Sequence, residues 1–353
     1  GLGDVYKRQA VSVSALMPDN DLADGRAESP FTLCLLLGIA YAASIGGMGT
    51  IIGTAPNVFT VSFISENLGR EISFVEWMTF AVPVVVVFVP AVWFVLTRLV
   101  YPVSAEPVAG AHERLREARA ELPPLEKGAV MTLGVFGVTA AAWVSRPWLN
   151  GLEIAGLTPL AGLTDAGIAV IAAVVLFLTP VAVRSGQFLM DWSGTRRLPW
   201  GLLILFGGGL ALAAQISATG LSAYLGYLAG VVEGLPAWAV VLTVTAAVVF
   251  LTELTSNTAT TATLVPVFLA VAIGLNLPPL LLIVPATLAA SCAFMLPVAT
   301  PPNAIVFGSG YLHVTQMSRA GFWLNLLAVV LITLAAWLVI VPLLGIPVAG
   351  QGN

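Results

Sequence analysis

Residues 289 to 303 read Ala-Ala-Ser-Cys-Ala-Phe-Met-Leu-Pro-Val-Ala-Thr-Pro-Pro-Asn, and residues 42 to 57 read Ala-Ala-Ser-Ile-Gly-Gly-Met-Gly-Thr-Ile-Ile-Gly-Thr-Ala-Pro-Asn. The two stretches are versions of one pattern, and each lies inside an apolar segment. Gly permits irregular backbone and Pro lacks a donor, so both stretches are expected to interrupt a helix. Two related interrupted helices at membrane depth are typical of a transporter whose binding site lies between them.

The composition predicts a protein that lies in a lipid bilayer. Apolar residues make up 58% of the chain and charged residues only 9%, which is more apolar surface than a soluble domain can bury. Continuous apolar runs, such as 77–97 and 322–343, can cross a hydrocarbon core of about 30 Å as helices. We therefore expect an all-α polytopic membrane protein. Cys34 and Cys292 fall in apolar runs and are expected to pack there without forming a disulfide.

The apolar runs predict seven crossings and one re-entrant hairpin. The expected spans are 30–63 (broken near 46–56), 74–100, 129–149, 165–183, 199–216, the hairpin 236–275, 279–310 (broken near 297–302) and 320–345. Six divisions are expected along the chain. They are a leader or cytoplasmic segment (1–29), the end of a first repeat (30–101), a cytoplasmic linker (102–128), scaffold helices of the second repeat (129–235), the re-entrant hairpin with the second broken helix and the last spanning helix (236–345), and a tail (346–353). Residues 1–9 of the leader read as non-native. Four Trp near span ends are interpreted as interfacial anchors: Trp77, Trp143, Trp148 and Trp200.

The distribution of cations predicts which span ends are cytoplasmic. If the N-terminal end is cytoplasmic and the hairpin enters and leaves on the outer side, only Arg70 and Arg146 of the 14 Lys and Arg residues lie outside. This asymmetry follows the positive-inside rule. We expect a multi-pass protein of the cell inner membrane with an external C-terminus.

The centre of the predicted hairpin, residues 252 to 261, is densely polar. Such residues cannot face lipid, because an unsatisfied polar group in hydrocarbon costs several kcal/mol. A helix that starts near Thr258 directs free N–H groups at the hairpin tip, which suits an anion without any Arg or Lys. The preceding helix ends there, so its carbonyls, with Thr252 and Asn257, suit a sodium ion.

The interrupted stretches supply similar chemistry. Three prolines, Pro56, Pro301 and Pro302, are expected to break the helices, and the carbonyls that they free can coordinate an ion. Asn57 and Asn303 are expected to hold the two half-helices of each break together.

Four motifs in order resemble one known family. They are Gly46 to Asn57, Phe206 to Leu210 (Phe-Gly-Gly-Gly-Leu), Thr252 to Thr258 with its Ser-Asn-Thr, and Cys292 to Gly308 with its Ala-Thr-Pro-Pro-Asn-Ala. Together they resemble the divalent anion:sodium symporter family of di- and tricarboxylate transporters, over residues from about 30 to the end. The resemblance implies an inverted-repeat, elevator-type secondary transporter, a homodimer in its full-length form.

The resemblance also implies roles for individual residues. The substrate, a small dicarboxylate of the succinate, malate or fumarate type, is expected at Ser256, Asn257, Thr258, Thr300 and Thr54. Sodium, the coupling ion, is expected at Thr252, Thr255, Asn257, Ala299 and Gly53. Catalytic residues, other cofactors, other metals and nucleic acid are not expected.

The chain departs from the family pattern in two places. Family members carry an earlier hairpin with its own Ser-Asn-Thr, and no such segment precedes residue 30, so the first repeat is expected to be incomplete. Ala55 also replaces the first Pro of the usual Thr-Pro-Pro-Asn. Pro56 can still break the helix there.

Several alternatives stay open from the residues alone. The polar tip can cap a buried helix end without any ligand, and Glu253 can be functional or can bond to hairpin backbone. The run Gly207, Gly208 and Gly209 indicates close helix packing and not a phosphate cradle, because no Lys follows. Other functions to weigh are an arsenite transporter or sodium–proton antiporter of the same superfamily, a membrane-embedded enzyme that uses Glu253, and an inactive fragment.

Overall fold

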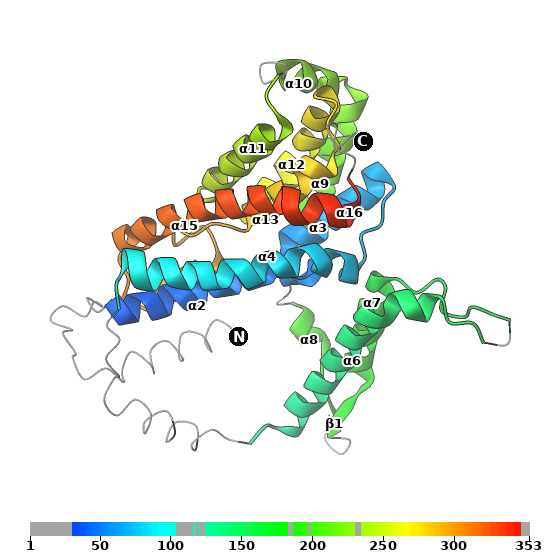
Figure 1. Cartoon of the computed structure of the whole chain (residues 1–353). Coiled ribbons are helices and arrows are strands. Elements are labelled where there is room, and N and C mark those ends of the chain that lie inside the picture. The colour runs from blue at the N-terminus through cyan, green and yellow to red at the C-terminus, as the bar shows by residue number, and fades with distance from the viewer. Residues whose placement is uncertain are drawn as a thin grey trace. The chain divides into compact units, whose positions relative to one another are not determined.

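The computed structural model describes residues 30–103, 116, 120, 124–154, 156–182, 186–196, 198, 200–229 and 234–346 (Figure 1). The expected leader 1–29, most of the expected linker 102–128 and the tail from 347 lie outside these residues. The chain divides into two compact units. Among the described residues, unit 1 holds 30–72, 77–103 and 201–346, and unit 2 holds 73–76 and 116–200.

Unit 1 begins with the first interrupted helix. Its elements are α2 (Pro30–Met48), the 3-10 turn η1 (Ile51–Gly53), α3 (Ala55–Leu68), α4 (Phe74–Phe94) and the π-helical turn η2 (Val95–Val100). The predicted break near 46–56 is thus confirmed. Gly69 ends α3 in the left-handed conformation (φ 61°), which glycine adopts at little cost.

The C-terminal half of unit 1 holds the hairpin and the second interrupted helix. Its elements are α9 (Gly201–Ala218), α10 (Leu221–Ala229), α11 (Ala237–Thr252), α12 (Asn257–Gly274), α13 (Leu280–Ala290), α14 (Pro301–Phe307), α15 (Val314–Ala335), η5 (Ala336–Ile340) and α16 (Val341–Leu344). The hairpin packs on the second interrupted helix, since both α11 and α12 contact α13.

Unit 2 contains α6 (Lys127–Asn150), α7 (Asp165–Leu178), a two-stranded antiparallel sheet of β1 (Pro180–Ala182) and β2 (Gln187–Phe188), and α8 (Trp192–Thr195). The carboxylate of Asp165 pairs with the Arg146 guanidinium at 2.7 Å and accepts from the Phe74 N–H at 3.0 Å. The Phe74 ring stacks on Trp143. These contacts hold the end of α6 against the start of α7.

Six helices among the described residues are long and apolar enough to cross a membrane. They are Pro30–Met48, Phe74–Val100, Lys127–Asn150, Gly201–Ala218, Asn257–Gly274 and Val314–Leu344. The chain is therefore a multi-pass helical membrane protein, and the short β1–β2 sheet is an addition to the expected all-α fold.

Three expected boundaries were wrong, and one helix was not predicted. The span 165–183 ends at Leu178, because Pro180 starts a strand, and the last span begins at Val314 and not at 320. The helix α10 was not predicted. The second break is not confined to 297–302, since α13 already ends at Ala290, before the first Pro of the motif.

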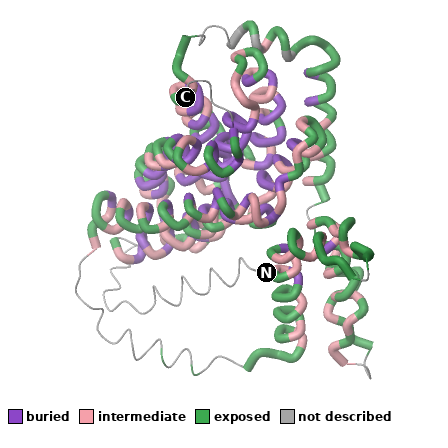
Figure 2. Tube along the Cα trace, turned by 45° about the vertical axis from the view of Figure 1, so that its right-hand side comes forward, coloured by how far each residue is buried: buried purple, intermediate pink, exposed green. Residues whose placement is uncertain are grey.

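Buried residues of unit 1 gather inside its helical bundle (Figure 2). Every residue of α13 is buried. Glycine permits the close approach of two helices: a Cβ on Gly321 of α15 would lie 2.4 Å from the Phe294 backbone, and one on Gly209 of α9 would lie 2.9 Å from the carbonyl oxygen of Ala262. The expected packing role of the glycine run is thus confirmed for Gly209, whereas Gly208 has nothing within 4 Å.

The cysteine prediction is confirmed, because Cys34 and Cys292 are both free and buried. Two of the four Trp residues interpreted as interfacial anchors are buried. Trp148 and Trp200 are exposed, but Trp77 and Trp143 are buried within the protein and act as hydrogen-bond donors there. Each has an acceptor in the chain, which an interfacial anchor does not need.

Candidate functional site

The hairpin tip lies between the end of α11 at Thr252 and the start of α12 at Asn257. Ser256 occupies the N-cap position, yet its side chain makes no cap hydrogen bond. Thr258 is buried and Ser256 is exposed. The tip thus presents the first turn of an 18-residue helix without a side-chain cap, and the positive end of such a helix favours an anion.

A hydroxyl and an amide expected to bind sodium lie together at this tip. The hydroxyl of Thr252 is within 2.8 Å of the amide oxygen of Asn257 and within 2.9 Å of the carbonyl oxygen of Ala290. Thr252 is fully buried, whereas Thr255 is exposed. The structure therefore brings Thr252 and Asn257 into contact, while the hydroxyl of Thr255 bonds to the Leu251 carbonyl and the Thr260 hydroxyl.

The two helix breaks share one device, which we name the Asn clamp. The side-chain amide of Asn57 donates to the carbonyl of Thr50 at 2.8 Å and lies 3.3 Å from that of Gly47. The side-chain amide of Asn303 donates to the carbonyls of Leu296 at 3.1 Å and Ala293 at 3.0 Å. At both breaks, acceptors lie seven and ten residues before the Asn, and the Asn57 amide has a third acceptor, the Met48 carbonyl at 3.3 Å. Asn57 thus ties the start of α3 both to Gly47 in α2 and to the link, as expected, whereas Asn303 ties the start of α14 to the link alone, because α13 already ends at Ala290.

Each clamp leaves an oxygen free. The amide oxygens of Asn57 and Asn303 are buried without a hydrogen-bond partner among the described residues. The same holds for the hydroxyls of Ser44 and Ser291, which are the serines of the two Ala-Ala-Ser triplets. Buried oxygens without a donor are suited to a cation, because an unpaired buried acceptor otherwise costs about 1–3 kcal/mol.

The remaining predicted site residues lie at the breaks. Thr54 and Thr300 are the N-caps of α3 and α14, and the Thr300 hydroxyl accepts from the Asn303 N–H at 3.2 Å. Ala299 is buried directly before Thr300. A Cβ on Gly53 would lie 2.2 Å from the carbonyl oxygen of Gly47, so only glycine fits there. The structure thus assigns these residues to two breaks and the others to the tip.

Glu253 connects the tip with the second break. Glu253 follows the last residue of α11. Its carboxylate accepts hydrogen bonds from three successive backbone N–H groups, those of Phe294 at 2.6 Å, Met295 at 2.8 Å and Leu296 at 3.1 Å. The side-chain amide of Asn325 on α15 donates to it at 2.8 Å. Of the two alternatives left open for Glu253, bonding to hairpin backbone is not what the structure shows, because the partners of its carboxylate belong to the break and to α15.

The carbonyls of the same link are also bonded. The Phe294 carbonyl accepts from the Tyr41 hydroxyl at 2.8 Å and the Met295 carbonyl from the Ser318 hydroxyl at 3.2 Å. Sequence reasoning missed Tyr41, Ser318 and Asn325, whose partners lie far away in the chain. For Tyr41 and Asn325, a polar side chain among apolar neighbours in a predicted span is the signal that could have found them, whereas Ser318 lies outside the predicted span 320–345.

The two interrupted helices contact one another. The hydroxyls of Thr60 on α3 and Thr287 on α13 lie 2.7 Å apart, and the Cys292 sulfur lies 3.9 Å from that of Met48. In addition, α14 packs on α2. The two breaks are therefore held within one bundle.

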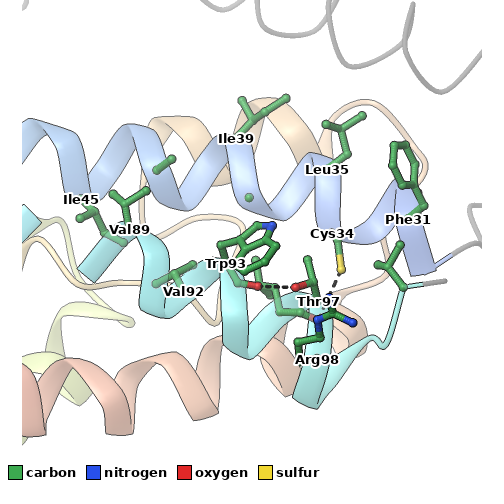
Figure 3. Close-up of a pocket in the computed structure, with 14 residues that line it drawn as sticks. Phe31, Cys34, Leu35, Ile39, Ile45, Val89, Val92, Trp93, Thr97 and Arg98 are labelled. Atoms are coloured by element: carbon green, nitrogen blue, oxygen red, sulfur yellow. Dashed lines mark hydrogen bonds between the residues drawn. The ribbon is translucent and has the colours of Figure 1, made fainter. Parts of the chain in front are cut away.

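A cavity of about 520 Å³ lies apart from this site, between α2 and the end of α4 (Figure 3). Its walls are mainly apolar, with Leu35 and Ile39 from α2 and Val92 and Trp93 from α4. Cys34 and Arg98 lie at one end. The cavity contains none of the predicted site residues.

Known proteins share this sequence pattern and fold. Residues 15–344 match the family described as the sodium:sulfate symporter transmembrane region. The chain is 38% identical over 343 residues to the sodium-dependent dicarboxylate transporter SdcS of Staphylococcus saprophyticus, covering 96% of this chain and 65% of that protein. It is 36% identical over 320 residues to SdcS of Staphylococcus aureus, covering 90% and 61% respectively. The chain thus spans less than two thirds of the length of these relatives.

A solved structure has a similar fold. The transporter YdaH of Alcanivorax borkumensis superposes with a TM-score of 0.54 at 14% identity, covering 98% of this chain and 83% of that one. At this identity the likeness concerns the fold alone.

Proposed function

The chain belongs to the sodium:sulfate symporter family, and we propose that it takes part in sodium-coupled transport of small dicarboxylates, of the succinate, malate or fumarate type, across the cytoplasmic membrane. The observation that carries this proposal is the uncapped start of α12 beside the bonded pair of Thr252 and Asn257. That tip offers N–H donors for an anion and oxygen atoms for a cation at one place.

In this proposal the substrate binds at the tip and at the N-caps of the breaks. Ser256, Asn257 and Thr258 hold one carboxylate through the first turn of α12, and Thr300 and Thr54 contribute hydroxyls from α14 and α3. The free hydroxyl of Ser256 and the buried position of Thr258 support this assignment. Donors from backbone and hydroxyl groups suit a dianion that must later be released.

In this proposal, sodium binds at two sites that are lined by oxygen atoms of the tip and of the breaks. Thr252, Thr255, Asn257 and Ala299 form one site, and Gly53 contributes to a second. The unpartnered oxygens of Asn57 and Asn303 support a cation near each break. Sodium binding first would order the tip and the breaks, after which the substrate dianion binds.

Transport follows from rigid movement of a transport part that holds the hairpin and both interrupted helices, in an elevator-type cycle within a homodimer of the full-length protein. Residues 30–101 and 236–345 form this part, while 129–235 form a scaffold and 102–128 a linker. The proposed orientation has a cytoplasmic N-terminal end. The distribution of Lys and Arg along the sequence supports this orientation. Two hydrogen bonds join chain ends that it places on the same side: Arg70 donates to the Leu344 carbonyl and Tyr101 to the Gln316 carbonyl.

Uptake into liposomes tests the proposal. The full-length protein should accumulate radiolabelled succinate only when an inward sodium gradient is present, and sodium-independent uptake would reject the coupling. Competition by malate but not by sulfate, citrate or arsenite would define the substrate class.

A variant tests the site itself. Asn257→Ala should abolish succinate uptake while the protein stays monodisperse, because it removes the amide that meets Thr252 and starts α12. The matched control is Asn67→Ala on α3, where the side-chain amide only returns to the Phe63 carbonyl. Unchanged transport by Asn257→Ala would remove the site assignment.

A further inference from the structure

We propose that Glu253 is a positioning residue that holds the second break in register with the hairpin tip and thereby sets the affinity of the site for sodium. The inference rests on the proposed function. It starts from one contact pattern, in which a single carboxylate accepts from three successive backbone N–H groups, those of Phe294, Met295 and Leu296.

The chemistry of this contact needs a carboxylate. Successive N–H groups that point to one side form a concave anion site, and the Asn325 amide adds a fourth donor at 2.8 Å. An ionised carboxylate is an acceptor only, so both oxygens can serve these donors. A side-chain amide of the same length has one acceptor oxygen and an NH₂ group, which would face a donor. The Leu296 N–H, which donates to the second carboxylate oxygen, would then face the NH₂ group, and because Glu253 is only 3% exposed, water cannot readily replace the lost acceptor.

The position of this contact links both halves of the proposed sodium site. Glu253 directly follows Thr252 at the tip. On the other side, the Leu296 carbonyl accepts from the Ala299 N–H at 3.3 Å and from the side-chain amide of Asn303. A displaced 294–296 link would therefore move Ala299 relative to Thr252. Misplacement of an oxygen ligand weakens ion binding without removing any ligand.

The contacts argue against Glu253 as a proton carrier or a direct ligand. Each group bonded to its carboxylate is a donor that belongs to the protein: three backbone N–H groups and the amide of Asn325. A carboxylate with both oxygens engaged in this way acts through the link that it holds. Its effect is therefore expected on the sodium dependence of transport and not on the maximal rate.

The test measures succinate uptake against sodium concentration in liposomes with the full-length protein. Glu253→Gln should raise the half-saturating sodium concentration at least tenfold, while uptake at saturating sodium stays near that of the unmodified protein. Glu253→Asp keeps the charge and shortens the reach, so its shift should be smaller. Glu66→Gln, the same change at an exposed position of α3, should shift nothing.

The outcomes separate the inference from its premise. A lower maximal rate with an unchanged half-saturating sodium concentration would mean a structural role only and would overturn the inference. If Glu253→Gln is not recovered as folded protein, an unshifted sodium curve for Glu253→Asp overturns it equally. Absence of sodium-dependent uptake by the unmodified protein would overturn the proposed function, and the inference with it.

Discussion

The two helix breaks have the same Asn clamp but different surroundings. At both, an Asn amide reaches carbonyls seven and ten residues earlier. At the second break, α13 is buried along its whole length and Glu253 caps the link, whereas at the first break α2 has exposed residues. Each link exposes one apolar side chain, Ile52 at 49% and Val298 at 84%. The difference teaches that the clamp defines the local shape of a break, while the hairpin provides its cover.

Substitution of the two clamp residues, Asn57 and Asn303, should lower the stability of the protein more than any other change proposed below. Asn303→Leu leaves the buried Ala293 carbonyl without its amide donor, which is expected to cost about 1–3 kcal/mol, while the Leu296 carbonyl keeps its bond from the Ala299 N–H. Asn57→Leu removes the matching bonds at the first break and should cost less, because α2, the helix before that link, is partly exposed, whereas α13 is fully buried. Thermal unfolding in detergent measures both. Equal losses would contradict the role assigned to the surroundings.

The next largest losses of stability are expected where a glycine allows two backbone segments to approach closely. Gly53→Ala places a Cβ 2.2 Å from the Gly47 carbonyl oxygen, and Gly321→Ala places one 2.4 Å from the Phe294 backbone. Overpacking of this kind costs about 1–3 kcal/mol. Gly46→Ala is the matched control, since nothing lies within 4 Å of its Cβ. Thermal stability and uptake should both fall for the first two variants and not for the control.

The sodium ligands at the tip should differ from one another. Thr252→Val removes a buried hydroxyl shared between Asn257 and Ala290, so we expect a severalfold rise in half-saturating sodium. Thr255→Val removes an exposed hydroxyl and should shift the curve less. The comparison uses the uptake assay described above. A larger shift for Thr255→Val would mean that the ion lies closer to the Thr255 hydroxyl than to that of Thr252.

The smallest effect is expected where the two interrupted helices meet. Thr60→Val removes one neutral hydrogen bond to Thr287, which contributes about 1 kcal/mol. The Thr287 hydroxyl keeps its bond to the Ile283 carbonyl, so no buried donor is left unpaired. Thr243→Val, on an exposed face of α11, is the control for the loss of a helical hydroxyl. The thermal unfolding temperature of Thr60→Val should be only slightly lower than that of Thr243→Val.

The sequence alone predicted the parts of this fold that depend on local pattern. Apolar run length located most spans, and Gly, Pro and Asn located the first break and both clamps. Prediction from the sequence failed where a residue far away in the chain determines the local structure. The second break starts at Ser291 because Glu253 draws the N–H groups of 294–296 away from helical bonding, and no local pattern encodes that contact. Tyr41, Ser318 and Asn325 escaped prediction for the same reason.

The bond between Arg70 and the Leu344 carbonyl has a practical consequence for assays of sidedness. It places the end of α16 beside the end of α3, so both are reached from one compartment. A reporter enzyme that is active on only one side of the membrane should therefore give the same reading when inserted at Gly69 as when fused after Leu344. Both readings should be opposite to that of a reporter inserted after Val103, beyond the far end of α4.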